Sequence, residues 1–91
     1  MATAGIQFKI MPEGVETDLE KLKEDIKTAV ETFESGVFNE VKEEPIAFGL
    51  KALIVTMALS EDEESEAVEK TLSEIEDISS VELIDYRRVV G

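Results

Sequence analysis

The segment LKALIVTMAL, residues 50–59, constrains the fold of this chain more than any other part of the sequence. It is the most apolar stretch, it is rich in β-branched side chains, and residues typical of turns flank it. A short apolar run with these features is typical of a strand in the interior of a sheet. We therefore predict that residues 50–59 form a central strand.

Three other segments predict further strands. Residues 5–11, GIQFKIM, alternate between apolar and polar side chains, which is the pattern of a half-buried strand. Residues 37–44 show a weaker alternation, and residues 80–89, SVELIDYRRV, predict the last strand. Between the first and second of these strands, and again between the third and fourth, the apolar period changes from two residues to three or four, which indicates helices.

Both helices are expected to begin with a capping box. In TDLE, residues 17–20, the Thr17 hydroxyl would cap the helix and Glu20 would reach back to the Thr17 backbone. The sequence SEDE, residues 60–63, matches the same pattern before the second helix. Ser35 and Gly36 are expected to end the first helix. The expected apolar stripes consist of Leu19, Leu22, Ile26, Val30 and Phe33 in the first helix and of Val68, Leu72 and Ile75 in the second.

The predicted element order, βαββαβ, is that of the ferredoxin-like α+β plait. Two right-handed crossovers place both helices on one face of a four-stranded antiparallel sheet and leave the other face open. We expect residues 1–91 to form one domain. In this topology the turn near Phe48 and the C-terminal DYRRVVG lie at opposite ends of the sheet, about 25 Å or more apart for strands of eight residues.

The charge and composition exclude several classes of function. The chain has 22 Asp and Glu against nine Lys and Arg, so its surface repels phosphate backbones and anionic lipid. We therefore expect no direct nucleic-acid or membrane binding, and a partner with a basic surface. Cysteine and histidine are absent, which excludes disulfides and imidazole chemistry. The N-terminal residues do not match a signal peptide, and no apolar run approaches about 20 residues, so a cytoplasmic protein is expected.

The carboxylates are numerous, but their pattern does not predict catalysis. They occur in runs such as SEDEESE, residues 60–66, which is better explained by a helix start than by a calcium loop. The five glycines form neither of the common phosphate-binding motifs. We expect a protein that is not an enzyme and that holds no cofactor or metal.

The turn within EEPIAFGLKA, residues 43–52, has an unusual polarity. Pro45 and Gly49 mark a turn, yet the aromatic Phe48 lies between them, where polar residues are usual. Two interpretations stay open from spacing alone. Phe48 folds back over the end of the core, or it is exposed and is buried by a partner.

The adjacent cations Arg87 and Arg88 stand near the end of an otherwise acidic chain. They could be a solvated pair that balances Glu82 and Asp85 across the sheet. Alternatively, they contact a partner.

Three segments resemble archaeal-type translation elongation factor 1-beta. They are ETDLEKLKEDI at residues 16–26, EPIAFGLKAL at residues 44–53 and VELIDYRRVV at residues 81–90. The resemblance implies a guanine-nucleotide exchange factor for elongation factor 1-alpha, the GTPase that delivers aminoacyl-tRNA to the ribosome. It also implies the ferredoxin-like plait.

The resemblance further implies which residues contact the GTPase. The aromatic residue of the turn docks on the second domain of the GTPase in the eukaryotic members, and this position is Phe48. A lysine near the C-terminus enters the magnesium and phosphate region of the nucleotide site; it aligns with Arg88, and Arg87 is the alternative. The expected partner-binding residues are Pro45, Ile46, Phe48, Lys51, Tyr86, Arg87 and Arg88.

The sequence therefore predicts an exchange factor that is monomeric when free. The alternative is a regulatory plait that senses a small molecule and dimerises through its open sheet face. Self-association together with metabolite binding would favour this alternative, whereas binding to the GTPase would favour the exchange factor.

Overall fold

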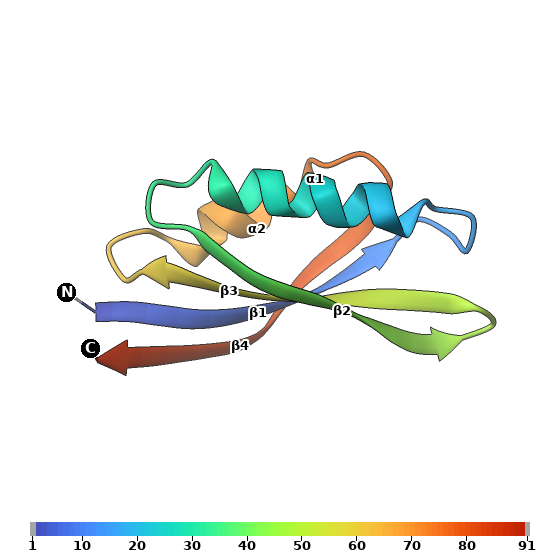
Figure 1. Cartoon of the computed structure of the whole chain (residues 1–91). Helices are drawn as coiled ribbons and strands as arrows, with labels where there is room; N and C mark the ends of the chain where they lie inside the picture. Colours follow the sequence, from blue (N-terminus) through green and yellow to red (C-terminus); the bar gives the residue numbers. More distant parts are fainter. Residues whose placement is uncertain (1, 91) are drawn as a thin grey trace.

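The structure, a computed structural model, describes residues 2–90 and contains four strands and two helices in the predicted βαββαβ order (Figure 1). The elements are β1 Ala2–Pro12, α1 Leu19–Glu31, β2 Val37–Ala47, β3 Leu50–Ser60, α2 Ser65–Ser73 and β4 Ile78–Val90. Neither helix is long and apolar enough, within residues 2–90, to cross a membrane.

The four strands form one antiparallel sheet in the order β2-β3-β1-β4. The strand β3, which contains the apolar segment, lies between β2 and β1, so its prediction as a central strand is confirmed. Both helices cover the same face of the sheet, above it in Figure 1. The predicted ferredoxin-like plait is therefore confirmed, because the helices and the strand order agree with it.

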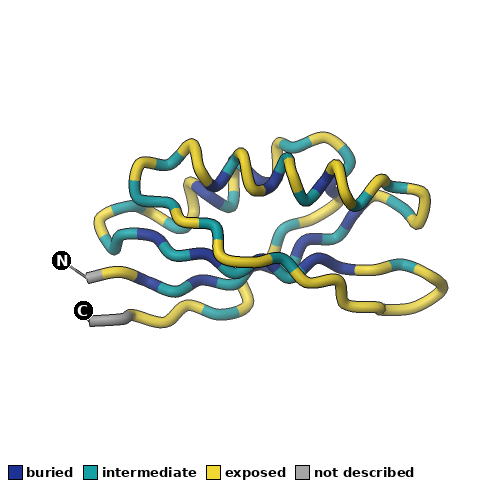
Figure 2. Tube along the Cα trace, in the orientation of Figure 1, coloured by how far each residue is buried: buried dark blue, intermediate teal, exposed yellow. Residues whose placement is uncertain are grey.

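The core lies between the helices and the covered face of β1 and β3. Ile6, Phe8 and Ile10 alternate along β1 and are fully buried, as the period of two predicts. The other large buried side chains are Leu22, Ile26 and Val30 on α1, Leu53, Val55, Met57 and Leu59 on β3, and Val68 and Leu72 on α2. Each such side chain contributes about 1.5–3 kcal/mol of hydrophobic stabilisation. Figure 2 shows that burial is concentrated in this layer and that the far end of the β2–β3 hairpin is exposed.

The first capping prediction is wrong by one residue. Asp18, and not Thr17, is the N-cap of α1, because its Oδ1 accepts a hydrogen bond from the Lys21 backbone N at 3.2 Å. The Thr17 Oγ1 instead accepts from the Gly14 N at 3.3 Å and closes the preceding turn. Aspartate caps a helix as well as threonine does, so two adjacent candidates could not be separated by residue type.

The second capping prediction is also wrong, because α2 begins at Ser65 and not after Ser60. Glu63 is used elsewhere: its Oε1 accepts from the Ser35 Oγ at 2.9 Å and from the Ser35 N at 3.2 Å. The Ser35 Oγ in turn accepts from the Ser60 N at 3.0 Å. This network joins the α1–β2 and β3–α2 loops, and it keeps Ser60 at the end of β3.

The expected separation of the two candidate regions is confirmed by the strand register. Ala47 pairs with Leu50 at the hairpin end of the sheet, and Arg88 pairs with Ala4, which pairs on its other side with Leu59. Nine steps along β3 at 3.3 Å each correspond to about 30 Å. The hairpin tip and the termini accordingly lie at opposite ends of a molecule with extents of 42 × 21 × 18 Å (Figure 1).

Candidate functional site

The β2–β3 hairpin ends in a two-residue turn, Phe48–Gly49, which is tighter than the turn predicted over residues 45–49. Both residues have positive φ, 53° for Phe48 and 81° for Gly49, as a type I′ turn requires. Glycine adopts this conformation freely, whereas a bulky residue does so at a cost of about 1–2 kcal/mol.

The Phe48 side chain projects fully into solvent, with a relative exposure of 101%. The interpretation of Phe48 as a cover over the core is therefore wrong. A large aromatic side chain thus occupies a strained turn position without contributing to the core.

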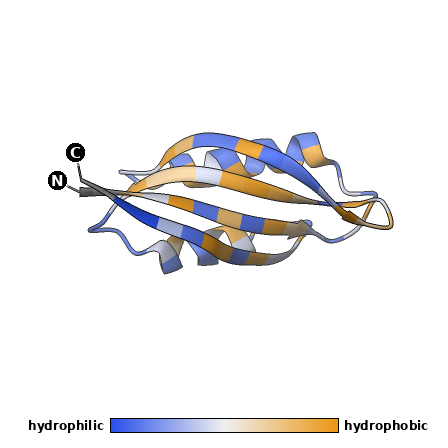
Figure 3. Cartoon of the chain, turned by 90° about the horizontal axis from the view of Figure 1, so that it is seen from below, coloured by the Kyte–Doolittle hydropathy of each residue, from blue (hydrophilic) through white to orange (hydrophobic). Residues whose placement is uncertain are grey.

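Two more exposed apolar residues lie at the same end of the molecule. Ile46 is 45% exposed next to the turn, and Val15, in the β1–α1 loop, is 63% exposed. A Cβ placed on Gly49 would lie 3.8 Å from the Val15 Cγ1, so this loop lies beside the hairpin tip. The tip is coloured as hydrophobic at the right of Figure 3. Nothing in the sequence pattern singles out Val15 except that it is the one large apolar residue in the loop EGVETD, residues 13–18.

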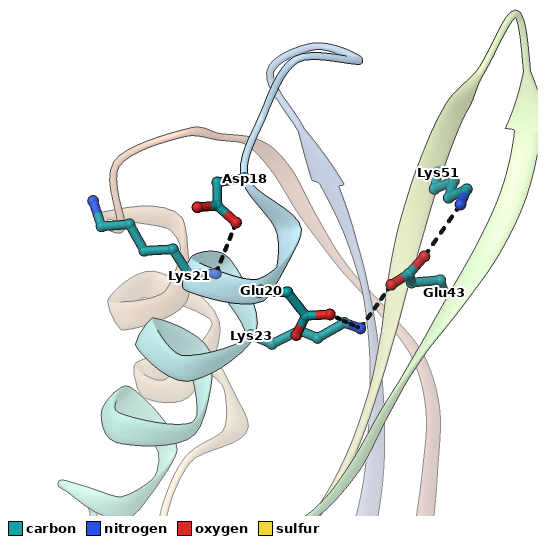
Figure 4. A network of polar contacts seen from close by, with 6 residues as sticks. All are labelled: Asp18, Glu20, Lys21, Lys23, Glu43 and Lys51. Atoms are coloured by element: carbon teal, nitrogen blue, oxygen red, sulfur yellow. Dashed lines mark hydrogen bonds and ion pairs between the residues drawn. The ribbon is translucent and has the colours of Figure 1, made fainter.

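An ion network connects the hairpin to α1 (Figure 4). The Glu43 carboxylate forms ion pairs with the Lys23 Nζ at 2.7 Å and with the Lys51 Nζ at 3.3 Å. The Lys23 Nζ also lies 3.8 Å from the Glu20 Oε1. Lys51, a predicted partner-binding residue, therefore joins β3 to β2 and, through Glu43, to the helix.

The network changes the pKa values of its two central groups. Hydrogen bonds from Lys23, and secondarily from Lys51, lower the pKa of the Glu43 carboxyl below its ordinary value. The hydrogen bond with Glu43 raises the pKa of Lys23. Both shifts favour the charged forms of Glu43 and Lys23 at neutral pH.

We expect Glu43→Gln to lower the thermal midpoint at pH 7 but not in acid. The pKa of Glu43 is lower in the folded protein than in the unfolded chain, so the ionised carboxylate stabilises the fold. This stabilisation is fully present above the unfolded-state pKa of about 4.3, and it disappears as the pH falls through the folded-state pKa. Melting curves from pH 7 to pH 3 check this. Glu44→Gln is the matched control, because Glu44 is the next residue of β2 and faces the other side of the sheet. Identical pH profiles for both variants would contradict the role of the network.

The second candidate region lies on the final part of β4. Tyr86 pairs with the buried Ile6 and Arg88 pairs with the buried Ala4, so both lie on the face that the helices cover. Arg87 pairs with Gly5 and lies on the open face. The two adjacent arginines therefore point to opposite faces of the sheet.

Each arginine has its own acidic partner. The Arg87 Nε lies 3.1 Å from the Asp85 Oδ2, so Asp85 is its partner as expected, but the pair lies along β4 and not across the sheet. Arg88 instead forms an ion pair with Glu61 in the β3–α2 loop, which sequence patterns did not predict. Tyr86 borders a hollow near this pair, whose other lining residues are Glu61, Glu63, Glu64, Ser65 and Glu66. Within residues 2–90, no group of three or more carboxylates is arranged to hold a metal ion.

The structure thus separates the predicted residues into two groups. Pro45, Ile46, Phe48 and Lys51 lie on the β2–β3 hairpin, and Tyr86, Arg87 and Arg88 lie on β4 near the opposite end. Such an arrangement suits a surface that contacts a large partner at two separate points, and it does not form a single pocket.

Comparisons with known proteins identify the family of this chain. The model of the EF-1 guanine nucleotide exchange domain matches residues 5–89. The elongation factor 1-beta of Methanosphaera stadtmanae is 42% identical over 91 residues, which cover 99% of this chain and 100% of that protein. The elongation factor 1-beta of Methanosarcina acetivorans is 38% identical over 90 residues, which cover 98% of this chain and 100% of that protein.

A solved structure supports the fold alone. The C-terminal domain of the MgtC protein from Mycobacterium tuberculosis has a TM-score of 0.66 with 10% identity, covering 94% of this chain and 87% of that one. The family model and the nearly complete coverage of the relatives are the stronger findings. They show that the chain belongs to the family of EF-1 guanine nucleotide exchange domains.

Proposed function

We propose that this exchange factor promotes GDP release from elongation factor 1-alpha by contacting the GTPase at both ends of its sheet. Phe48 and its neighbours provide an apolar anchor, and an arginine of β4 reaches the nucleotide site. The observation that carries this proposal is the separation of an exposed aromatic tip and a cationic tail by about 30 Å on one sheet.

The two contacts have different thermodynamic roles. An exchange factor must bind the nucleotide-free GTPase more tightly than the GDP-bound form, and by linkage it then weakens GDP binding by the same factor. An apolar anchor that lies far from the nucleotide stabilises both forms of the complex equally. The preference for the nucleotide-free form must therefore come from the other end of the sheet, where a cation can compete with the magnesium ion for the phosphates.

The acidic surface supports a GTPase as the partner. The formal net charge of −13 favours encounter with a protein whose surface is basic enough to handle tRNA, and disfavours direct binding to nucleic acid or membrane. The reaction breaks no covalent bond, so the factor is not an enzyme in that sense. We further propose that residues 1–91 act as one cytoplasmic exchange domain that is monomeric when free.

Release of a fluorescent GDP from elongation factor 1-alpha tests the assignment. We expect the wild-type protein to accelerate release in a concentration-dependent manner. Failure to accelerate release from the GTPase of the same organism would refute the proposed function. Self-association with binding of a small metabolite would instead favour the alternative regulatory plait.

Two matched substitutions can decide which arginine acts on the nucleotide. We propose Arg88, whose guanidinium is held by Glu61 and must leave that pair to reach the GTPase. Glu61→Gln should release Arg88 and raise the rate of GDP release about two- to fivefold, the factor expected from weakening a partly exposed ion pair. Asp85→Asn releases Arg87 in the same way and should leave the rate unchanged. The opposite result, measured in the same release assay, would assign the role to Arg87.

A further inference from the structure

We infer that the hollow between the β1–α1 loop and the β2–β3 hairpin is a socket for an apolar side chain of the GTPase segment that also receives Phe48. This inference rests on the proposed function. It adds to the projecting Phe48 side chain a neighbouring hollow that receives a side chain of the partner. The hollow holds about 160 Å³. Its lining residues are Pro12, Gly14, Val15, Leu19, Gly49 and Lys51.

The lining explains why the hollow stays open. Two of its residues are glycines and bring no side chain into it. A Cβ on Gly14 would meet no heavy atom within 4 Å, so the space beside this residue is empty. A Cβ on Gly49 would already be in contact with the Val15 side chain at 3.8 Å. The apolar side chains of the wall leave room for a branched aliphatic or methionine side chain.

The hollow is continuous with the proposed anchor. Gly49 belongs both to the hollow and to the turn, and it directly follows Phe48. The hollow and the exposed Val15 therefore lie next to the surface that a partner would cover in burying Phe48. Apolar groups at the centre of an interface contribute most when they are fully enclosed, and a filled socket would exclude water there.

The charge at the rim defines the occupant further. Lys51 lines the hollow, and its Nζ lies 3.3 Å from the Glu43 carboxylate, which also binds Lys23. Because Glu43 keeps Lys23 as a partner, Lys51 can turn to a carboxylate of the GTPase without leaving Glu43 uncompensated. We therefore expect an apolar side chain with an adjacent Asp or Glu on the partner.

The test compares two exposed valines at opposite ends of the sheet. Val15→Asp should weaken binding to nucleotide-free elongation factor 1-alpha at least about tenfold, because it places a charge in a surface that becomes enclosed. Val37→Asp is the matched control: Val37 is 54% exposed and pairs with Ala58, away from the hairpin tip. Equal dissociation constants for the two variants would overturn the socket.

A second variant fills the hollow without adding charge. Gly14→Val introduces a side chain where the structure has open space, so it should preserve the thermal midpoint and weaken binding several-fold by excluding the occupant. Unchanged binding would again overturn the socket. The proposed function is judged separately: if wild-type protein accelerates GDP release and Phe48→Ala weakens the complex, that function stands even when both socket variants bind normally.

Discussion

Replacing Phe48 with alanine should weaken the complex with elongation factor 1-alpha about 30-fold or more and leave the stability of the free protein unchanged. The first effect follows because truncation of a central aromatic anchor costs about 2 kcal/mol or more of binding free energy. The second follows because Phe48 is fully exposed, so alanine removes no packing. Titration calorimetry with the nucleotide-free GTPase, and thermal melting of the free protein, measure the two effects.

The strained turn permits a stricter version of this test. Phe48→Gly removes the same aromatic ring but also relieves the positive φ of 53°. This variant should therefore bind as weakly as Phe48→Ala while the free protein becomes more stable. A substitution that stabilises the fold and weakens the complex cannot be explained by unfolding.

A control variant separates the tip from apolar surface in general. Ile84 is 44% exposed on β4, close to the exposure of Ile46, and it lies in the middle of the strand. Ile84→Ala should bind normally. If Phe48→Ala binds as tightly as Ile84→Ala, the anchor is not Phe48, and binding at this end must depend on Ile46 and Val15.

The fold could be predicted because its elements follow simple periods. The alternation in β1 and the apolar run in β3 determine which strands lie inside the sheet, and the three- and four-residue steps identify both helices. The starts of the helices could not be fixed as well. At Thr17 and Asp18 two suitable caps are adjacent, and at Glu63 the carboxylate binds Ser35 on another loop, a contact between distant residues that local spacing does not encode.

The sequence predicts which turn or strand carries each candidate residue, but not the face of the sheet on which the residue lies. Strict alternation from Leu83, which pairs with the buried Phe8, would place Arg88 on the open face. The register shift after Gln7 leaves Ile84 as an extra residue, so the faces of all later residues are exchanged. Arg88 is thereby turned toward Glu61. A bulge has little sequence signal, and therefore only the structure assigns the two arginines to opposite faces.

The second large effect is expected at the tail. Arg87→Gln combined with Arg88→Gln should lower the maximal rate of GDP release about 30-fold or more, because a cation that acts on phosphates in an enclosed site contributes roughly 2–5 kcal/mol. The concentration that gives half the maximal rate should change by less than about threefold, since the apolar end is intact. Stopped-flow release of fluorescent GDP at a series of factor concentrations separates the two quantities.

Substitution is preferable to truncation for this test because the tail is part of the sheet. The strand β4 continues to Val90, and Arg87 and Arg88 pair with Gly5 and Ala4 of β1. A chain cut before Arg87 would lose these pairs, and it could lose activity through the fold alone. Glutamine keeps the backbone pairing and removes only the charge. Lys42→Gln, in the middle of β2, is the matched loss of a cation away from both ends and should release GDP at the wild-type rate.

The pattern of the two kinetic quantities decides what the arginines do. A lower maximal rate with an unchanged half-saturating concentration means that the cations act after binding, on the nucleotide. A higher half-saturating concentration with an unchanged maximal rate would make them docking residues only. The preference for the nucleotide-free GTPase over the GDP-bound form would then have to come from other residues. Arg88→Lys adds a final distinction, because it keeps the charge but not the planar guanidinium. Recovery of the rate by lysine would show that charge at the nucleotide site is sufficient, whereas no recovery would show that the guanidinium geometry is required.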